Sequence, residues 1–499
     1  MRLTLRCVSV LCLAAAVKLC AQTAYFEVSD GIWENPSNWS THVIPGDTNS
    51  VSVTFSGRTV HITQPGALCA NLVVGYSFGE TGTVHLATGT LYSVTSQNIG
   101  RNGRGTFIQE AGTTNRFSSF VTVGEGTTGN GQYRLQGGFV GENGVAGDVN
   151  VGYNGTGVFY QTGGVLGDFG TSSSSRYLYL GRTATGLGTY VMDGGEVLLT
   201  NQSYVSIGHV GSGRFIQSNG TVRVANTFNV GKESGGRGDY RLVNGTIRSG
   251  QFTIGEKATA QGMALIEGGY FGTTVEGLDV GYYGTGAVAQ SSGIVTLNKY
   301  LFIGRAAGSK GTYVMTGGEL ALTNANNHVY VGEYGNGTLL QSNGSVRVKN
   351  WCTVSRQTSS SGLYRMSGGS LTVDLNLQLG EQPSSSARFE IVGTNAAVAC
   401  KTMVITTNAV LRFEIATNGV SKISVQNQAT LAGKLEVAVQ QKLFNQPVTV
   451  IDAGSLSGQF GTVTPVFPLK SVDVAYQTGS GNVVLSNFRY FTGTLMTLF

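Results

Sequence analysis

Short stretches of alternating apolar and polar residues recur along most of the chain, and each is bounded by glycine or asparagine. The segment 312–316 ends at Gly317-Gly318, the segment 319–323 ends at an asparagine-rich corner, and the segment 328–331 ends at Gly332. A period of two over a few residues, closed by turn-forming residues, is typical of short β-strands. The pattern predicts three short strands and three corners in each repeating unit.

A phrase of the form Gly-x-aromatic-x-(Gln/Met/Leu)-x-(Gly/Asn)-Gly opens each unit. Copies begin at Gly105, Gly131, Gly157, Gly188, Gly213, Gly238, Gly262, Gly286, Gly311, Gly337 and Gly362, with a degenerate copy at Gly82. A second signature, a β-forming triplet closed by a corner glycine, recurs from Gly75 to Gly380 at intervals of about 25 residues. Self-similarity at this period predicts an all-β solenoid, a single-stranded parallel β-helix of about 12–13 coils.

The phrase also predicts which side chains face the core. Its middle position holds Arg134, Arg241 and Arg365, so this position points outward and its two neighbours point inward. Stacking the coils then gives an aromatic ladder and a second ladder of glutamine and aliphatic residues. The first contains Phe107, Tyr133, Phe159, Tyr190, Phe215, Tyr240, Tyr313 and Tyr364, and the second contains Gln109, Leu135, Gln161, Met192, Gln217, Leu242, Gln290, Met315, Gln341 and Met366. A buried glutamine must find hydrogen-bond partners in a neighbouring coil.

The sequence also contains a longer repeat that spans several coils. Tyr177-Leu-Tyr-Leu-Gly-Arg matches Tyr300-Leu-Phe-Ile-Gly-Arg, and Gln217-Ser-Asn-Gly matches Gln341-Ser-Asn-Gly. We interpret this as a five-coil block, residues 152–255, duplicated at residues 281–380 within a repeat region that spans 61–386.

The two ends of the chain lack the phrase. Residues 1–21 have the charged start and apolar run of a secretory signal, with cleavage expected near Ala21. Residues 22–60 read as an N-terminal cap containing Trp33 and Trp39, which alternatively form a small-domain core or a platform for carbohydrate. Residues 387–486 alternate over longer strands and read as a C-terminal β-helix end or cap, followed by a tail at 487–499.

Two motifs carry a family resemblance. Gly31-Ile-Trp-Glu-Asn-Pro-Ser-Asn-Trp39 and the later phrase Ala429-Thr-Leu-Ala-Gly-Lys-Leu435, together with the corner glycines, resemble bacterial secreted β-helix proteins of the autotransporter-passenger and autotransporter-associated-repeat kind. The resemblance covers about residues 25–485 and implies a right-handed β-helix on a secreted or cell-surface protein. Such helices serve as adhesins, spacers and polysaccharide-cleaving enzymes, so the fold alone does not decide the function.

Charge and cysteine content exclude several classes. Without Arg2, Arg6 and Lys18 the formal charge falls from +5 to +2, and no Lys/Arg cluster offers a nucleic-acid footprint. Cys69, Cys352 and Cys400 are an odd number of widely spaced thiols, so neither a disulfide framework nor a zinc site is predicted. No further segment of the mature chain reads as a membrane span.

Candidate catalytic groups are scattered. Polysaccharide-cleaving β-helices need clustered carboxylates, with or without Ca²⁺. The aspartates with this potential are Asp148, Asp168, Asp193, Asp239 and Asp279, and the nearest approaches to a cluster are the pairs Glu276/Asp279 and Asp193/Glu196. We interpret them as solvated corner residues, with Asp148 and Asp279 at equivalent places in the duplicated blocks. The histidines His42, His61, His85, His209 and His328 are interpreted as isolated surface or turn residues without metal-ligand spacing.

The sequence therefore predicts an extracellular or cell-surface structural or adhesive protein without catalytic, metal or cofactor sites. Its expected partners are a surface polysaccharide or the surface of a host or neighbouring cell, and not nucleic acid. The alternatives are a polysaccharide lyase or glycosidase with a groove near residues 167–177 or 276–279, and a carbohydrate-binding protein.

Overall fold

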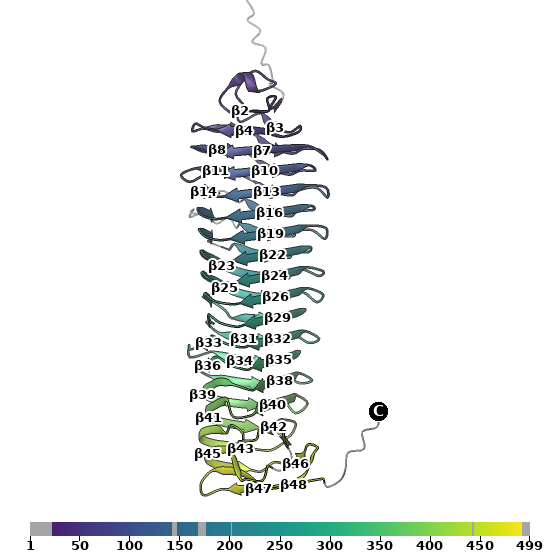
Figure 1. The fold of residues 1–499 in the computed structure, drawn as a ribbon, viewed down its shortest axis with the longest axis vertical. Helices are drawn as coiled ribbons and strands as arrows, with labels where there is room; N and C mark the ends of the chain where they lie inside the picture. The colour runs from purple at the N-terminus through teal and green to yellow at the C-terminus, as the bar shows by residue number, and fades with distance from the viewer. Residues whose placement is uncertain (1–21, 142–146, 168–175, 201, 442–443, 492–499) are drawn as a thin grey trace, which may run out of the picture.

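The computed structural model describes residues 22–141, 147–167, 176–200, 202–441 and 444–491. It is a right-handed parallel β-solenoid of about 17 turns of about 25 residues, with 59% strand and 1% helix. Figure 1 shows the turns stacked along one axis, from the purple N-terminal coils to the yellow C-terminal strands. Among the described residues, no helix is long and apolar enough to span a bilayer.

The first strand of every coil belongs to one parallel ladder, which runs without a break from β2 to β46. Its strands are β2 (Asp30–Ile32), β4 (Arg58–Ile62), β7 (Thr81–Leu86), β10 (Arg104–Gln109), β13 (Asn130–Leu135), β16 (Thr156–Gln161), β19 (Leu187–Met192), β22 (Ser212–Gln217), β24 (Arg237–Leu242), β26 (Gln261–Ile266), β29 (Thr285–Gln290), β32 (Lys310–Met315), β35 (Asn336–Gln341), β38 (Ser361–Met366), β40 (Ser386–Val392), β42 (Val410–Ile415), β44 (Lys434–Val439) and β46 (Thr462–Pro465).

The second and third strands of the coils form two further ladders. The second ladder contains β5 (Ala67–Cys69), β8 (Thr90–Ser93), β11 (Thr114–Phe117), β14 (Phe139–Val140), β17 (Val165–Gly167), β20 (Glu196–Leu199), β27 (Tyr270–Thr273), β30 (Ile294–Thr296), β33 (Glu319–Leu322) and β36 (Ser345–Val348). The third contains β1 (Thr23–Tyr25), β3 (Ser50–Val53), β6 (Asn71–Val74), β9 (Ser96–Ile99), β12 (Phe120–Val123), β15 (Asp148–Val151), β18 (Tyr177–Leu180), β21 (Tyr204–Ile207), β28 (Leu278–Val280), β31 (Tyr300–Ile303), β34 (His328–Val331) and β37 (Trp351–Val354).

In some coils the corner between the second and third strands is reduced to a shift of register. These coils contain the merged strands β23 (Thr221–Val230), β25 (Thr246–Ile254), β39 (Gly369–Leu379), β41 (Ala396–Ile405), β43 (Ile423–Leu431) and β45 (Val448–Gly458). In β23 the first part pairs with β20 and the second part with β21. The predicted three-strand coil is therefore confirmed, with the second and third strands merged into one in these coils.

The turn count exceeds the predicted 12–13 coils because winding continues beyond the repeated phrase. Before Gly75, the strands β2 and β4 already pair in parallel with the ladder. After Gly380, the strands β40, β42, β44 and β46 stay in parallel register with β38. Alternating apolar residues suffice to keep the ladder there, although the glycine of the phrase is lost at Ala387 and the aromatic register ends with Phe389.

The core contains the two predicted ladders. Phe107, Tyr133, Phe159 and Tyr190 are fully buried, and their successive ring centroids lie 4.8, 4.6 and 4.7 Å apart in stacked geometry. The glutamines at the second ladder position are buried as well. Each accepts a hydrogen bond from a tyrosine hydroxyl of the following coil, in the pairs Gln109–Tyr133, Gln161–Tyr190, Gln217–Tyr240, Gln290–Tyr313 and Gln341–Tyr364.

The two ends of the stack are closed differently. At the N-terminus, beside the short helix η1 (Pro36–Asn38), Trp33 and Trp39 are buried at 1% and 0% exposure, and Trp39 Nε1 donates to the Trp33 carbonyl at 2.8 Å. The alternative of a tryptophan platform for carbohydrate is therefore wrong, because neither ring is available to a ligand. At the C-terminus, β48 (Asn482–Tyr490) pairs antiparallel with β45 and with β47 (Leu469–Gln477) and covers the last coil.

Candidate functional site

The outer face of the third ladder carries a continuous column of side chains, which we call the outer column. Its members lie two residues before the corner position, which is a glycine in most coils, and are in register from coil to coil. They are Tyr25, Ser52, Val73, Asn98, Thr122, Asn150, Tyr179, Ser206, Asn229, Thr253, Asp279, Phe302, Tyr330, Thr353 and Gln378. Polar and aromatic residues dominate the column, which is unlike the aliphatic residues that face inward from the same strands.

Although they point away from the core, most outer-column side chains are buried. Thr122, Asn150 and Asn229 are 2%, 1% and 1% exposed. The cover comes from the residues directly after the corner position, which we call the roof residues. They include Tyr76, Arg101, Glu125, Tyr153, Arg182, His209, Lys232, Glu256, Tyr282, Arg305, Glu333, Arg356 and Glu381. The guanidinium of Arg182 lies 4.4 Å from the ring centre of Tyr179, and that of Arg356 lies 4.5 Å from Tyr330.

Ion pairs connect the roof residues along the rod. Arg356 lies 2.9 Å from Glu333 and 3.4 Å from Glu381, and Arg305 lies 3.0 Å from Asp279 and 3.9 Å from Glu333. Burial raises the pKa of the Asp279 carboxyl, and the charge of Arg305 and the hydrogen bond from Gln251 partly offset that rise. A partly buried network of this kind holds the roof in place over the outer column.

Four outer-column side chains have a polar atom without a hydrogen-bond partner in the described part of the chain. The atoms are Ser52 Oγ, Asn98 Oδ1, Asn229 Oδ1 and Thr353 Oγ1. A buried polar atom left unpaired costs about 1–3 kcal/mol. Such atoms are uncommon in native proteins, and their concentration in one column marks this face as the candidate binding surface.

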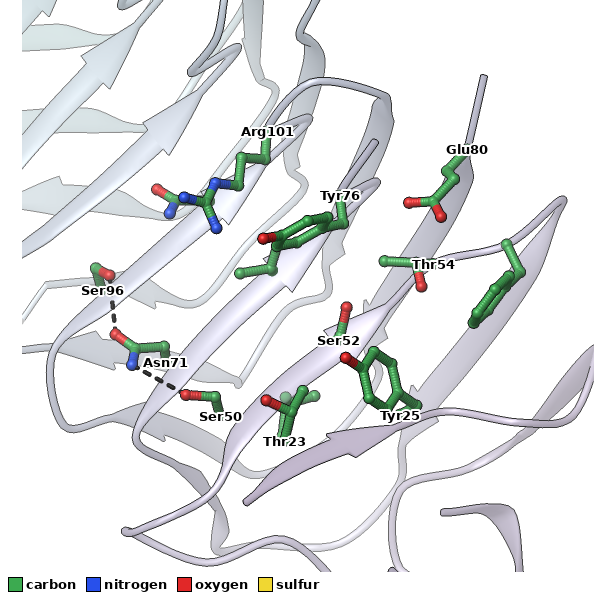
Figure 2. A pocket seen from close by; sticks show the side chains of 14 residues that line it. Thr23, Tyr25, Ser50, Ser52, Thr54, Asn71, Tyr76, Glu80, Ser96 and Arg101 are labelled. Carbon is green, nitrogen blue, oxygen red and sulfur yellow. Dashed lines mark hydrogen bonds between the residues drawn. The ribbon is translucent and has the colours of Figure 1, made fainter. Parts of the chain in front are cut away.

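The outer column opens into a pocket near its N-terminal end, where the groove volume is about 640 Å³. Figure 2 shows Ser52 and Thr54 on its floor, with the rings of Tyr25 and Tyr76 beside them. The tyrosines are 43% and 47% exposed. At one edge, Asn71 accepts from Ser96 at 3.1 Å and donates to Ser50 at 3.2 Å (Figure 2).

The charged groups of this pocket are already engaged. Arg101 lies 3.3 Å from Glu125 and covers the ring of Tyr76, with 4.9 Å between the guanidinium carbon and the ring centre. The carboxylate of Glu80 accepts from the backbone N–H of Ser77 at 2.7 Å. What remains for a ligand is a set of hydroxyl and amide groups, several of them buried, beside the rings of Tyr25, Phe55 and Tyr76.

A second hollow on the same face has a volume of about 470 Å³ and contains Glu125, Asp148, Asn150, Tyr177 and Arg182. Burial raises the pKa of both carboxyls, and Arg101 beside Glu125 and Arg182 beside Asp148 oppose the rise. Arg182 donates to Asn150 at 2.6 Å and to Asp148 at 3.4 Å. Two carboxyl groups with raised pKa values therefore share one hollow.

The aspartates singled out from the sequence are dispersed, and one prediction about them is wrong. Asp148 and Asp279 are not equivalent, because the register places Asp279 in the outer column in line with Asn150 rather than with Asp148. Asp279 lies two residues before its corner glycine, Gly281, whereas Asp148 lies four residues before Gly152. Asp279 is also 1% exposed, so it is not a solvated corner.

The other carboxylates do not converge. Asp239 lies on β24 opposite Arg214 and Met263, Asp193 is an exposed corner residue, and Glu196 pairs loosely with Arg223 at 3.6 Å. Glu276 is paired with Lys299 at 2.6 Å, and Asp168 lies outside the described residues.

The interpretation of the histidines as isolated is wrong for two of them. His61 and His85 occupy the same register on β4 and β7, and their Nδ1 atoms lie 3.1 Å apart. The sequence signal was present, since 24 residues separate them, close to one coil. His209 is a roof residue whose pKa burial and the charge of Lys232 lower to about 4, and His328 begins β34. Within the described residues, no group of three or more His, Cys, Asp and Glu side chains is arranged to hold a metal ion.

The three cysteines in the described part of the chain are not exposed for reaction in the folded protein. Cys69, Cys352 and Cys400 are free and buried, and burial raises the pKa of each thiol to about 12. Since the thiolate is the reactive form, we expect these three thiols, in a chain that begins at Gln22, not to react with a thiol reagent such as 5,5′-dithiobis(2-nitrobenzoate) at pH 8 until denaturant is added. Reaction of the three thiols in the native protein at the rate of free cysteine would contradict this burial.

No protein-family model matches the chain, and no curated protein matches it significantly.

Proposed function

We propose that the protein is a secreted or cell-surface rod, structural and adhesive, without catalytic activity. The observation that supports this most directly is the unbroken parallel ladder from β2 to β46. Every coil depends only on its two neighbours, so the structure extends in one dimension and presents the same face many times. The secretory leader expected from residues 1–21 supports an extracellular location.

A rod of this kind has a defined length. Adjacent strands in a sheet lie about 4.8 Å apart, so about 17 turns correspond to a rod of about 80 Å. We expect small-angle scattering of the full chain to give the pair-distance distribution of a stiff cylinder of this length, unchanged between low and high salt. A distribution typical of a compact sphere, or of a chain with flexible joints between blocks of coils, would contradict the proposal.

The adhesive surface in this proposal is the outer column with its N-terminal pocket, and the partner is a neutral glycan. Sugar hydroxyls both donate and accept hydrogen bonds, which suits Ser52, Thr54 and Asn98 on the pocket floor. The proposal requires the Ser52 side chain to rotate to another staggered position when a ligand binds, because its unpartnered hydroxyl is buried in the free protein. Tyr25 and Tyr76 offer amphipathic rings at the pocket rim. An acidic ligand would require a free cation, whereas Arg101 is already paired with Glu125.

We expect Tyr76→Ala to weaken binding of a neutral hexasaccharide about five- to tenfold, because it removes one of the exposed rings at the pocket. Isothermal titration of the full chain with cellohexaose, maltohexaose and mannohexaose measures this. Ser52→Ala should weaken binding about threefold without lowering the urea midpoint of unfolding, because it removes a hydroxyl that has no partner in the free protein.

Tyr283→Ala is the matched control, because Tyr283 is similarly exposed, at 49%, but does not line the pocket. Its affinity should equal that of the unmodified chain. Equal losses of affinity in Tyr76→Ala and Tyr283→Ala, or tighter binding of hexagalacturonate than of any neutral sugar, would contradict the proposal that this pocket binds a neutral glycan.

A polysaccharide-cleaving enzyme is the second candidate, and the hollow that contains Glu125 and Asp148 favours it. Glycosidases use two carboxyl groups, of which the acid has a raised pKa. Against it, each carboxyl is paired with an arginine, Arg101 and Arg182 respectively. A reducing-end assay on neutral and acidic polysaccharides separates the candidates, because turnover that disappears in Glu125→Gln and in Asp148→Asn would replace the non-catalytic proposal.

A further inference from the structure

His61 and His85 lie side by side on the outer face of the first ladder, near the N-terminal end of the rod. They are paired residues of the adjacent parallel strands β4 and β7. Their side chains are 32% and 25% exposed. Their neighbours in the same register are Ile32 and Ile108, so no third histidine continues the column on either side.

The hydrogen bonds of the two rings determine which nitrogens carry hydrogen. His61 Nε2 lies 2.9 Å from Asp30 Oδ1, and His85 Nε2 lies 3.0 Å from Glu110 Oε1. An ionised carboxylate only accepts hydrogen bonds, so each Nε2 must be the donor. In a neutral imidazole the other nitrogen then carries a lone pair.

The two nitrogens that carry these lone pairs, Nδ1 of His61 and Nδ1 of His85, lie next to each other. The Nδ1 atoms lie 3.1 Å apart, and two acceptors at that separation repel each other unless a proton or a metal ion lies between them. With metal–nitrogen distances of about 2.05 Å, that separation corresponds to an N–metal–N angle of about 98°, which lies between octahedral and tetrahedral values.

We infer that His61 and His85 form a binding site for a divalent transition-metal ion of the copper, nickel and zinc class. Imidazole nitrogen suits these ions, whereas Mg²⁺ and Ca²⁺ prefer oxygen ligands. The two Nδ1 atoms are the protein ligands, and the partly exposed position leaves the other coordination positions to water.

The surrounding carboxylates have the arrangement that metal-binding histidines require. Metal-ligating histidines usually donate their second N–H to a carboxylate, which fixes the ring and makes the ligating nitrogen more basic. Asp30 and Glu110 fill this role. Glu110 is itself held by the amide of Gln136, which donates to its two carboxylate oxygens at 3.0 and 2.8 Å when its nitrogen faces them.

The test is direct metal binding by a tag-free full chain at pH 7.5. Isothermal titration should give one ion per chain, with affinity in the order Cu²⁺ above Ni²⁺ and Zn²⁺, and no heat with Mg²⁺ or Ca²⁺. The electron paramagnetic resonance spectrum of the Cu²⁺ form should show two equivalent nitrogen ligands. His61→Gln and His85→Gln should each weaken binding by more than about tenfold, and Glu110→Gln by about tenfold through the hydrogen-bonded partner.

His209→Gln is the matched control, because His209 has no histidine beside it and should leave binding unchanged. Far-ultraviolet circular dichroism and melting without metal establish that each variant folds as the unmodified chain does. The inference is overturned if Cu²⁺, Ni²⁺ and Zn²⁺ all fail to bind, if His209→Gln weakens binding as much as His61→Gln, or if the spectrum shows no nitrogen ligand. None of these results bears on the rod or the glycan pocket, which the scattering and sugar titrations test separately.

Discussion

Replacing Gly304 by alanine is expected to destabilise the solenoid by more than about 4 kcal/mol, which is an exceptionally large loss for a single substitution. Gly304 closes β31 with a φ of 72°. A Cβ atom there would lie 2.3 Å from the carbonyl oxygen of Asn336 and 2.4 Å from its carbonyl carbon. Asn336 begins β35 in the next coil, so the clash is with the backbone of the parallel ladder and not with the end of a flexible side chain. Urea unfolding followed by circular dichroism measures the loss.

Gly308→Ala is the control within the same coil. Its φ is 79°, but nothing lies within 4 Å of the position of a new Cβ. It therefore isolates the cost of the left-handed conformation, about 1–2 kcal/mol, from the cost of contact between coils. Because solenoid unfolding is not always two-state, hydrogen exchange should also show faster opening of β31, β34 and β35 in Gly304→Ala alone. Equal losses for the two variants would mean that close stacking does not explain the corner glycines.

Much of the fold followed from local patterning. The period of two, the corner glycines and the repeat of about 25 residues predicted the parallel ladder, the inward aromatic residues and the three-strand coil, all of which the structure shows. The number of coils did not follow, because β40, β42 and β44 keep the alternation without the glycine and aromatic phrase. A coil without the obligatory glycines leaves a weaker periodic signal, even where a buried aromatic residue such as Phe389 stays in register with Tyr364.

The candidate binding face was harder to predict because it depends on register between coils. Asn98 and Thr122 look like ordinary polar strand residues until stacking shows that roof residues cover them. Likewise, His61 and His85 become a pair only once two coils are aligned. The information was in the sequence as positions counted from each corner glycine, but scattered loop insertions hide such columns from a linear comparison.

The buried glutamine and tyrosine residues also depend on the register between coils, because each pair joins two neighbouring coils. Gln341→Leu is expected to destabilise the rod by about 2–4 kcal/mol. Gln341 Oε1 accepts from the Tyr364 hydroxyl at 2.6 Å, and its Nε2 donates to the carbonyl oxygens of Gly344 and Ser370 at 3.1 and 3.0 Å. In the variant the Gly344 carbonyl oxygen still accepts a hydrogen bond from the backbone N–H of Ser370, at 2.9 Å. The main loss is therefore the tyrosine hydroxyl left without an acceptor, at about 1–3 kcal/mol.

The double variant Gln341→Leu/Tyr364→Phe distinguishes a polar cause from a steric one. Leucine or methionine already occupies the same ladder position in alternate coils, as at Leu242 and Met315, so an apolar side chain fits there. Removing the hydroxyl together with its acceptor should recover about 1–2 kcal/mol of the loss, measured as the coupling in a double-mutant cycle of urea midpoints. If the double variant is instead as unstable as the sum of the two single variants, the hydroxyl is not what makes the glutamine necessary. The coupling, if found, explains why every glutamine of this ladder is followed one coil later by a tyrosine, since each coil then specifies which neighbour can stack upon it.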